Sequence, residues 1–408
     1  METTINQSLT EKHTHSSIKE FLLAIPFYVY VSVLASMCVI LGILWDIAWH
    51  MSIGRDGLFS APHVVVYIGA ASAGIFSGYQ VLKTSFWGNK LEKSKMVNFW
   101  GIFYSSLGGL FCIWGGIAAL TSAPFDDWWH NTYGLDVQIF SPPHTVLLLG
   151  LMSVQMGAMV SVLGFLNRKE HISYLSAKQN ATRSTRLQWM FVLTAGFFLS
   201  SIFTFLSEFL GRWEMHQASY YQIGSVAFPF CLIATARGSG MKWGATYIAI
   251  VFMVFHWGVN ATLRLLPAEP LLGPIYNKIT TYQTIGFPLL LVFPAFLIDW
   301  LRDKFSAKND WWLTVILALA YVVVFFIVQY PFGTFLHESE LSRNWFWGSN
   351  SWSFYNEPNW EFRYKFADWR ITKGIVDWAI GLGIALGLCL LSTRIGLAWG
   401  KWMKQVQR

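Results

Sequence analysis

Ten stretches of mostly apolar residues divide the chain, and they constrain its fold more than any other feature. A helix needs about 20 such residues to cross the roughly 30 Å hydrocarbon layer of a bilayer. The stretches are residues 22–45, 62–82, 98–122, 143–166, 188–209, 220–236, 243–263, 283–301, 311–330 and 374–393. They predict an all-α, polytopic integral membrane helix bundle with about ten transmembrane helices. The sixth stretch is the weakest candidate, because Pro229 interrupts a short run.

The composition excludes an ordinary soluble enzyme. Of the 408 residues, 54% are hydrophobic and 12% are charged, whereas a soluble globular domain has roughly 25% charged residues. The 22 Trp, 33 Phe and 16 Tyr residues suit aromatic belts at the two membrane–water interfaces. The net charge of +7 is small, so it requires neither a nucleic-acid partner nor an acidic substrate.

The distribution of Lys and Arg predicts the orientation of the chain. Twenty of the 29 Lys and Arg residues lie in the two terminal segments and in the even-numbered connections between spans. By the positive-inside rule, the N- and C-termini are then expected to be cytoplasmic. In a bacterium, the protein would be a multi-pass component of the inner (cytoplasmic) membrane. The segments facing the periplasm would be 46–61, 123–142, 210–219, 264–282 and 331–373.

These spans suggest five regions. Residues 1–20 form a cytoplasmic N-terminal tail, and residues 21–166 a four-helix core that contains an internal repeat. Residues 167–330 supply five further membrane helices, and residues 331–373, rich in aromatic side chains, an outer cap loop. Residues 374–408 give the last membrane helix and a cytoplasmic tail. The four cysteines lie in apolar runs without CxxC spacing, so neither a disulfide framework nor c-type haem is indicated.

The internal repeat is the strongest chemical signal. One pattern joins the first span to the second and, again, the third span to the fourth. Each copy reads Asp-x3-His, followed after 12 or 13 residues by a second His directly preceded by Pro. The repeated residues are Asp46, His50 and His63 in the first copy and Asp126, His130 and His144 in the second.

The spacing predicts a metal site in each copy. Asp and His four residues apart lie on one face of a helix, and the Pro suits the start of the next helix, which delivers the second His. Two histidines and one carboxylate leave coordination positions open, as Cu, Zn or non-haem Fe(II) require, and imidazole ligands favour copper. The candidates for holding the second ring nitrogen of a histidine are Asp56, Asp127 and Asp136. The alternative is a structural polar cluster without an ion.

The first copy resembles a known metal-binding stretch. The residues from Asp46 to Val64 are similar to that stretch in the C subunit of the copper membrane monooxygenases, the particulate methane and ammonia monooxygenase family. That family has an Asp-x3-His-x12-His triad in a similar Trp-His, Arg-Asp and Pro-His context. Its second set is spaced Asn-x3-His-x13-His, and here Asp126 replaces the Asn. The resemblance covers roughly residues 25–165 and implies copper in a divergent, longer relative.

The function that this resemblance implies is a copper-binding membrane subunit of a monooxygenase complex, which oxidises a small apolar substrate with O2. The expected partners are membrane lipid, other membrane or periplasmic subunits or further copies of the chain, and quinol as electron donor, with no nucleic acid. One alternative is a membrane subunit with b-type haem that transfers electrons from quinol. Another is a protein for copper handling or assembly. Zinc or iron can replace copper in either metal set.

The second half offers one more group of polar residues. Glu208, Glu214 and His216 follow one another at the predicted outer end of the fifth span, and His256 precedes Asn260 by one helical turn near the outer end of the seventh. They would form an additional polar or metal site if those helices meet. The alternative is a hydrogen-bonded cluster at the helix ends.

Overall fold

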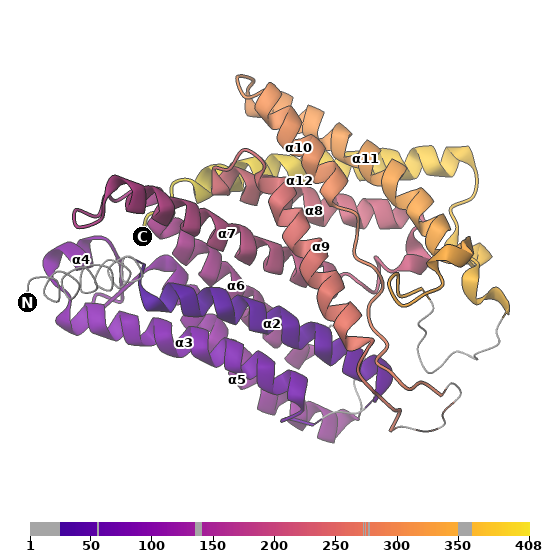
Figure 1. The fold of residues 1–408 in the computed structure, drawn as a ribbon, viewed down its shortest axis with the longest axis horizontal. Coiled ribbons are helices and arrows are strands. Elements are labelled where there is room, and N and C mark those ends of the chain that lie inside the picture. Colours follow the sequence, from indigo (N-terminus) through magenta and orange to yellow (C-terminus); the bar gives the residue numbers. More distant parts are fainter. Residues whose placement is uncertain are drawn as a thin grey trace, which may run out of the picture.

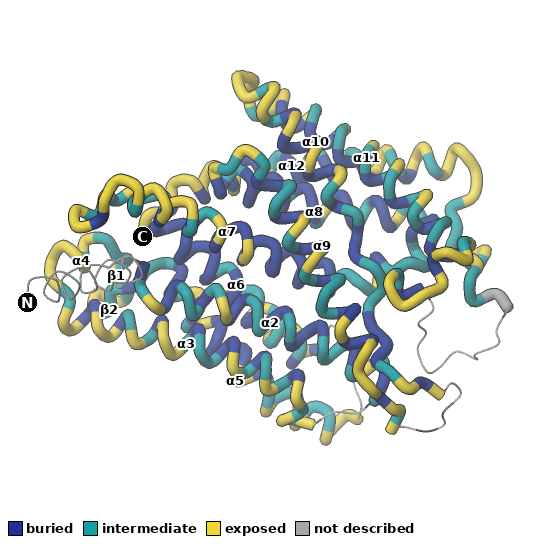
Figure 2. The backbone as a smooth tube through the Cα atoms, in the orientation of Figure 1, coloured by how far each residue is buried: buried dark blue, intermediate teal, exposed yellow. Residues whose placement is uncertain are grey.

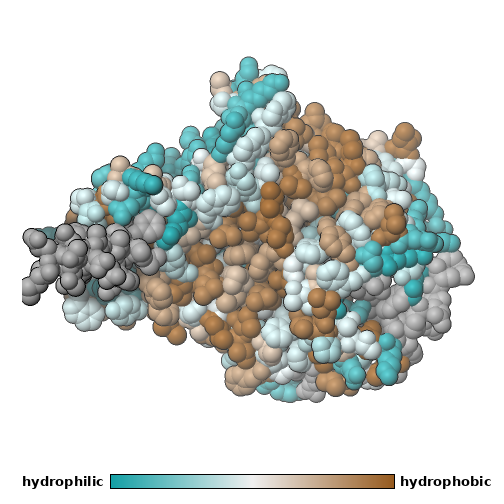
Figure 3. All heavy atoms as spheres, in the orientation of Figure 1, coloured by the Kyte–Doolittle hydropathy of each residue, from teal (hydrophilic) through white to brown (hydrophobic). Residues whose placement is uncertain are grey.

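The computed structural model describes residues 25–54, 57–134, 141–271, 273, 275, 278–349 and 361–408 (Figure 1). Within these residues almost all regular structure is α-helical. Eight of the described helices are long and apolar enough to cross a membrane, namely α2, α3, α5, α6, α7, α9, α11 and α12. Figure 3 shows hydrophobic residues over the middle of the molecule and hydrophilic residues towards the two ends of its long axis. The chain is therefore an all-α, multi-pass membrane protein, as predicted.

The N-terminal half is built from two helical hairpins. The first consists of α2 (Phe27–Ser52) and α3 (Ala61–Trp87), and the second of α5 (Leu107–Tyr133) and α6 (Pro142–Arg168). Between the hairpins lie the short α4 (Lys90–Ser94) and two antiparallel strands, β1 (Val97–Phe99) and β2 (Phe103–Ser105), with Val97 opposite Ser105.

The second half packs against α2 and α6. Its helices are α7 (Ala177–Phe205), α8 (Ala218–Ser239), α9 (Gly244–Leu263), α10 (Val292–Lys304), α11 (Asp310–Glu338) and α12 (Ile375–Met403). Four 3-10 turns join them: η1 (Arg212–Glu214), η2 (Glu340–Ser342), η3 (Glu361–Tyr364) and η4 (Asp368–Arg370). Figure 2 shows long buried stretches along α6 and α7, which pack against each other where the two halves meet, and along α8 inside the second half.

Two of the predicted spans differ from the structure. The stretch 220–236 lies in α8, a helix of 22 residues that is not among the eight apolar spans. The stretch 283–301 is helical only from Val292, and the 13 residues of α10 are too short to cross the hydrocarbon layer. Pro288 restricts the residue before it to extended backbone. The Leu290 N–H then donates to Oε1 of Gln329, a fully buried side chain of α11, at 3.2 Å. Non-helical backbone is tolerated at membrane depth when protein groups satisfy it in this way.

Two boundaries also need correction. The third span was expected to begin at residue 98, but α5 begins at Leu107, because residues 97–105 form the β-hairpin. Its turn has positive φ at Trp100 and Gly101. The outer cap was expected from residue 331, but α11 continues through Pro331 to Glu338, so the connection begins at Ser339.

A serine from α12 accommodates the proline inside α8. Pro229 cannot donate a backbone hydrogen bond and its ring disturbs the helix. The Ser392 hydroxyl accepts from the Phe230 N–H at 2.9 Å and donates to the Val226 carbonyl at 2.6 Å. It thus inserts into the bond that Phe230 and Val226 would make in a regular helix. This bridge explains how the predicted sixth stretch stays helical despite Pro229.

The two N-terminal hairpins pack in the same way. Gly69 of α3 and Gly150 of α6 both lie six residues after the second histidine of their repeat. A Cβ on Gly69 would lie 3.0 Å from the Ala35 carbonyl oxygen, and a Cβ on Gly150 would lie 2.9 Å from that of Gly115. The remaining close neighbours correspond as well: Cys38 and Val39 at Gly69, Ala118 and Ala119 at Gly150. Small residues let both helix pairs approach closely.

The contacts between the hairpins follow the same symmetry. Gly74 of α3 packs against Gly116 of α5. At the equivalent positions of the other helix pair, the Gln155 side-chain amide of α6 donates to the Ser36 carbonyl of α2 at 3.4 Å. Both hairpins begin on the same side, so a rotation about an axis along the helices relates them. The connections α2–α3 and α5–α6, which carry the repeated pattern, therefore emerge at the same end of the bundle (Figure 1).

Candidate metal centre

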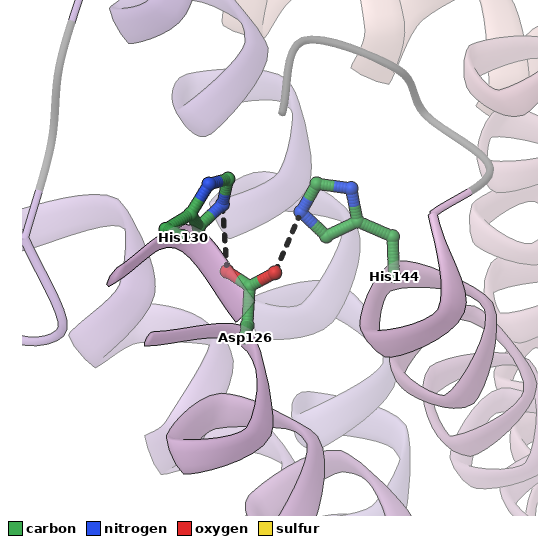
Figure 4. A group of neighbouring side chains, drawn as sticks. All are labelled: Asp126, His130 and His144. Carbon is green, nitrogen blue, oxygen red and sulfur yellow. Dashed lines mark ion pairs between the residues drawn. The ribbon is translucent and has the colours of Figure 1, made fainter. Parts of the chain in front are cut away.

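The second copy of the repeat brings its three side chains together. His144 Nε2 lies 3.3 Å from Asp126 Oδ1, and His130 Nε2 lies 3.5 Å from Asp126 Oδ2. Ligand atoms of all three residues lie within 4.8 Å of one another. Figure 4 shows the carboxylate between the two imidazoles, with Asp126 and His130 on one helix and His144 on another. The structure thus brings these three residues together at one point.

The helix ends explain how the three residues meet. Asp126 and His130 lie four residues apart near the C-terminus of α5, on one face of the helix. His144 is the third residue of α6, whose N-cap Ser141 accepts a hydrogen bond from the His144 N–H at 3.4 Å. Pro142 and Pro143 start this helix without leaving unsatisfied N–H groups.

The protonation of His130 suits a ligand. Its Nδ1 lies 3.3 Å from the carbonyl oxygen of Gly134. Because a carbonyl only accepts hydrogen bonds, this contact assigns the ring proton to Nδ1 and leaves a lone pair on Nε2. That lone pair is on the nitrogen nearest Asp126. Metal-binding histidines are commonly fixed through their other nitrogen in this way.

Asp126 Oδ1 is buried and makes no hydrogen bond with any described residue, although His144 Nε2 is only 3.3 Å away. Metal bonds to imidazole and carboxylate are about 2.0–2.2 Å long, so two such ligands of one ion lie roughly 3 to 3.5 Å apart. The spacing of the oxygen and the nitrogen, and the absence of a hydrogen bond between them, fit two lone pairs directed at one cation. The donor set therefore suits a divalent metal.

The first copy is similar but looser. His63 Nε2 lies 3.2 Å from Asp46 Oδ1, which is buried without a hydrogen bond like its counterpart in the second copy. His63 Nδ1 lies 3.1 Å from the Gly57 carbonyl oxygen, which again leaves Nε2 as the ligand atom. His50 Nε2 is 3.8 Å from Asp46 Oδ2, and its side chain is 49% exposed, compared with 25% for His130. Of the two trios, only the second has all its ligand atoms within 4.8 Å.

Two glycines at the ends of the His-bearing helices were not predicted from the sequence to matter for the site. Gly54 and Gly134 lie four residues after the first histidine of each copy, and both have positive φ, +100° and +93°. Gly134 has ψ −172°, a conformation that is essentially restricted to glycine. Each glycine ends its helix directly after the His-bearing turn. The recurring His-x3-Gly spacing was the signal that could have revealed them.

Of the three aspartates predicted to hold the second ring nitrogens, only Asp127 lies among the described residues. Asp127 is exposed and accepts a hydrogen bond from the Asn131 side chain at 3.3 Å, within its own helix. Asp56 and Asp136 lie outside the described residues. The Gly57 and Gly134 carbonyl oxygens contact the second ring nitrogens of His63 and His130.

The second-half candidates have separate partners. Glu208 is exposed. Glu214 forms an ion pair with Arg370; burial raises the pKa of the Glu214 carboxyl, which Arg370 opposes. The His216 ring lies between the rings of Tyr330 and Phe366, and His256 contacts Ser200 Oγ through Nδ1 at 3.1 Å. Glu214, His216 and His256 belong to packing contacts, and among the described residues the four side chains do not form a metal cluster.

Comparison with protein-family models, with curated proteins and with solved structures finds no match for this chain. The functional argument therefore depends on the geometry of the two repeated sets.

Proposed function

We propose that this protein is a copper-binding membrane subunit, similar to the C subunit of the copper membrane monooxygenases, in a complex that oxidises a small apolar substrate with O2. The observation that carries the proposal is the convergence of Asp126, His130 and His144 on one point, within 4.8 Å of each other. The first copy, built on Asp46, would hold a second ion less firmly, because His50 is farther from the carboxylate and more exposed.

The chemistry of the ligands supports copper. Two neutral imidazoles and one carboxylate leave coordination positions open, and imidazole sites bind Cu more tightly than other first-row divalent ions. Zinc and iron are the other candidates. Bound copper would supply binding and reduction of O2. One oxygen atom would enter the substrate and the other would leave as water. Two electrons and two protons must then come from a donor, for which we propose quinol.

The surroundings of the second set suit an apolar substrate. The aromatic rings of Phe125, Trp128, Trp129 and Tyr133 form a contiguous group beside Asp126 and His130 on α5. Such rings exclude water from one side of the site and can pack against a small hydrocarbon. The adjacent bilayer would concentrate both O2 and such a substrate.

We propose that both termini are cytoplasmic and that both metal sites face the periplasm of a bacterial inner membrane. Lys and Arg residues concentrate at the end of the molecule opposite the repeats, in or beside the connections α3–α5, α6–α7, α8–α9 and α10–α11. This asymmetry is what the positive-inside rule describes. Partner membrane or periplasmic subunits, or further copies of this chain, would complete the complex.

The alternative with b-type haem is less well supported. A haem ligated by two histidines needs them on opposite faces of the porphyrin, with no group between. Here Asp126 lies between His130 and His144. A copper-handling protein that moves ions across the bilayer would need ligands along a path, whereas the two sets lie at one end of the bundle (Figure 1).

The test is metal analysis of the full-length protein purified in detergent from copper-supplemented cells, combined with copper EPR. We expect His130→Ala to remove one copper equivalent and His50→Ala to remove a different one. His171→Ala, at an exposed position of the α6–α7 connection, is the control and should change nothing. Unchanged copper in both His130→Ala and His50→Ala would overturn the proposal. A Soret band in the purified protein would favour the haem alternative.

A further inference from the structure

The last turn of α2, which carries His50, is held by residues from the second half. Ser52 is completely buried, and its hydroxyl accepts from the Gln283 N–H at 2.7 Å and donates to the Ala48 carbonyl at 2.6 Å. The Leu271 N–H donates to the Ile53 carbonyl oxygen at 2.9 Å. Carbonyl groups at a helix C-terminus have no partner within the helix. The α9–α10 connection thus satisfies this end of α2.

The part of this connection that contacts α2 is itself braced. The Ala268 N–H donates to the Thr280 carbonyl, and the Tyr282 N–H to that of Leu266, which pairs the two sides of the loop. We call residues 264–268 and 280–283 the clamp. The Trp45 indole N–H donates to the Tyr282 hydroxyl at 3.4 Å. Ala48 packs with Leu263, Ala268 and Tyr282 in one apolar cluster.

The matching turn of α5 has a different environment. Thr132 occupies the position equivalent to Ser52, and its hydroxyl donates to the Trp128 carbonyl at 2.8 Å, as Ser52 does to Ala48. Thr132 is exposed, however, and Trp128, which replaces Ala48, has 52% exposure. The small Ala48 admits the clamp, while a Trp at that position would block it. The repeat thus provides two similar helix ends, and the clamp packs against the one that belongs to α2.

We propose that the clamp positions the last turn of α2 and thereby sets the copper affinity of the first site, with Ser52 as the positioning residue. This inference depends on the proposed function, because it concerns the same metal. His50 lies two residues before Ser52 on the turn that the clamp holds, so its position relative to Asp46 follows the backbone of that turn. Without the clamp, the turn would fray and the first site would lose a ligand.

The experiment measures copper binding to one site at a time. In a His130→Ala background, which leaves the first site, Ser52→Ala should raise the Kd for Cu(II) about tenfold and change the Cu(II) EPR hyperfine splitting. Ser52→Thr, which keeps the hydroxyl as Thr132 does in the second copy, should restore both. In a His50→Ala background, which leaves the second site, Thr132→Ala is the matched control and should change neither.

The outcomes separate this inference from the proposed function. If copper binds in both backgrounds but Ser52→Ala leaves the Kd and the EPR spectrum unchanged, the positioning role is wrong while the proposed function stands. If Ser52→Ala and Thr132→Ala weaken copper binding equally, the positioning role is also wrong, because loss of the hydroxyl then has the same effect at a helix end without the clamp. If neither background binds copper, both proposals fail. Tyr282→Phe, which removes only the acceptor of the Trp45 indole, should weaken the first site if Ser52→Ala does not fold.

Discussion

Gly69 and Gly150 occupy the same place in two hairpins, each six residues after a histidine and each against the helix that carries the matching aspartate. The close approach that they allow brings His63 and His144 to the depth of Asp46 and Asp126. The candidate metal ligands therefore depend on a helix contact that contains none of them. The two hairpins therefore share their helix packing as well as the spacing of their Asp and His residues.

Gly150→Ala tests this packing. The new methyl group would lie 2.7 Å from the Ala119 nitrogen and 2.9 Å from the Gly115 oxygen, and backbone atoms cannot move aside cheaply. We expect a loss of about 1 to 3 kcal/mol of stability, together with loss of copper from the second site before the first. Thermal unfolding in detergent and metal analysis of the same samples would check this.

The control for that substitution lies on the same helix. Gly164 of α6 is buried, but a Cβ there would have no neighbour within 4 Å. Gly164→Ala should therefore stabilise the protein by up to about 1 kcal/mol, through the helix preference of Ala over Gly. Equal melting temperatures for the two variants would show that the α5–α6 contact does not require Gly150.

Asp126→Asn tests the role of the carboxylate charge in the second set. Asn keeps the shape of Asp126 and gives the Asn-x3-His-x13-His spacing, but it removes the negative charge that lies between His130 and His144. We expect the Kd for Cu(II) at the second site to rise at least about tenfold, or about 1.4 kcal/mol. Asp127→Asn is the control, because Asp127 is exposed and bonds only to Asn131 among the described residues. If both changes weaken copper binding to a similar extent, the effect comes from the negative charge of this helix end in general and not from a carboxylate that binds the ion.

The sequence indicates that Asp126, His130 and His144 meet, because these three residues are close together in the chain. Asp126 and His130 share a helix face, and the Pro before His144 starts the next helix, so spacing alone implies that they meet. The same spacing applied to His50 did not reveal its exposure of 49%, because exposure depends on what packs around the turn. The clamp was also not predicted, since Gln283 lies 231 residues from Ser52.

In the fold, too, the features set by nearby residues were predictable from the sequence, and those set by distant residues were not. Apolar runs predicted the eight long apolar helices of the described residues, since length and hydropathy are properties of the run itself. They failed at residues 283–291, where the run is apolar but not helical, because Pro288 restricts the backbone before it and the buried Gln329 of α11 satisfies the Leu290 N–H. They also did not show the hairpin at residues 97–105, whose apolar strands resemble the start of a helix in composition.

Ser392→Ala tests how α8 tolerates its proline. The Ser392 hydroxyl bridges the Val226 carbonyl and the Phe230 N–H across the disturbed turn at Pro229. Its loss leaves two partly buried backbone groups without this partner, at a cost on the order of 1 kcal/mol. We expect a lower melting temperature in detergent. Ser219→Ala, at an exposed site of the same helix, should have no effect, and an unchanged Ser392→Ala protein would show that the turn closes without the bridge.

Because His216 is buried, we expect the folded protein to lose stability in acid. Burial lowers the pKa of the His216 imidazole below its ordinary value of 6.5, although the nearby Glu338 opposes the shift. The ring lies between Tyr330 and Phe366, and its Nε2 contacts the Tyr330 carbonyl and the Thr334 hydroxyl. The His216 imidazole therefore binds a proton more readily in the unfolded chain than in the native protein. Stability should therefore be complete above pH 6.5 and fall as the pH decreases below that value.

The measurement compares melting temperatures at pH 7.5 and pH 5 for the wild type and for His216→Gln. Gln cannot be protonated, so the difference between the two pH values should shrink by roughly 1 to 3 °C in the variant. His171→Gln, at an exposed position, is the matched control and should keep the wild-type difference. If His216→Gln also keeps that difference, protonation of His216 does not contribute to the acid sensitivity, and its position between the two rings is purely a packing contact.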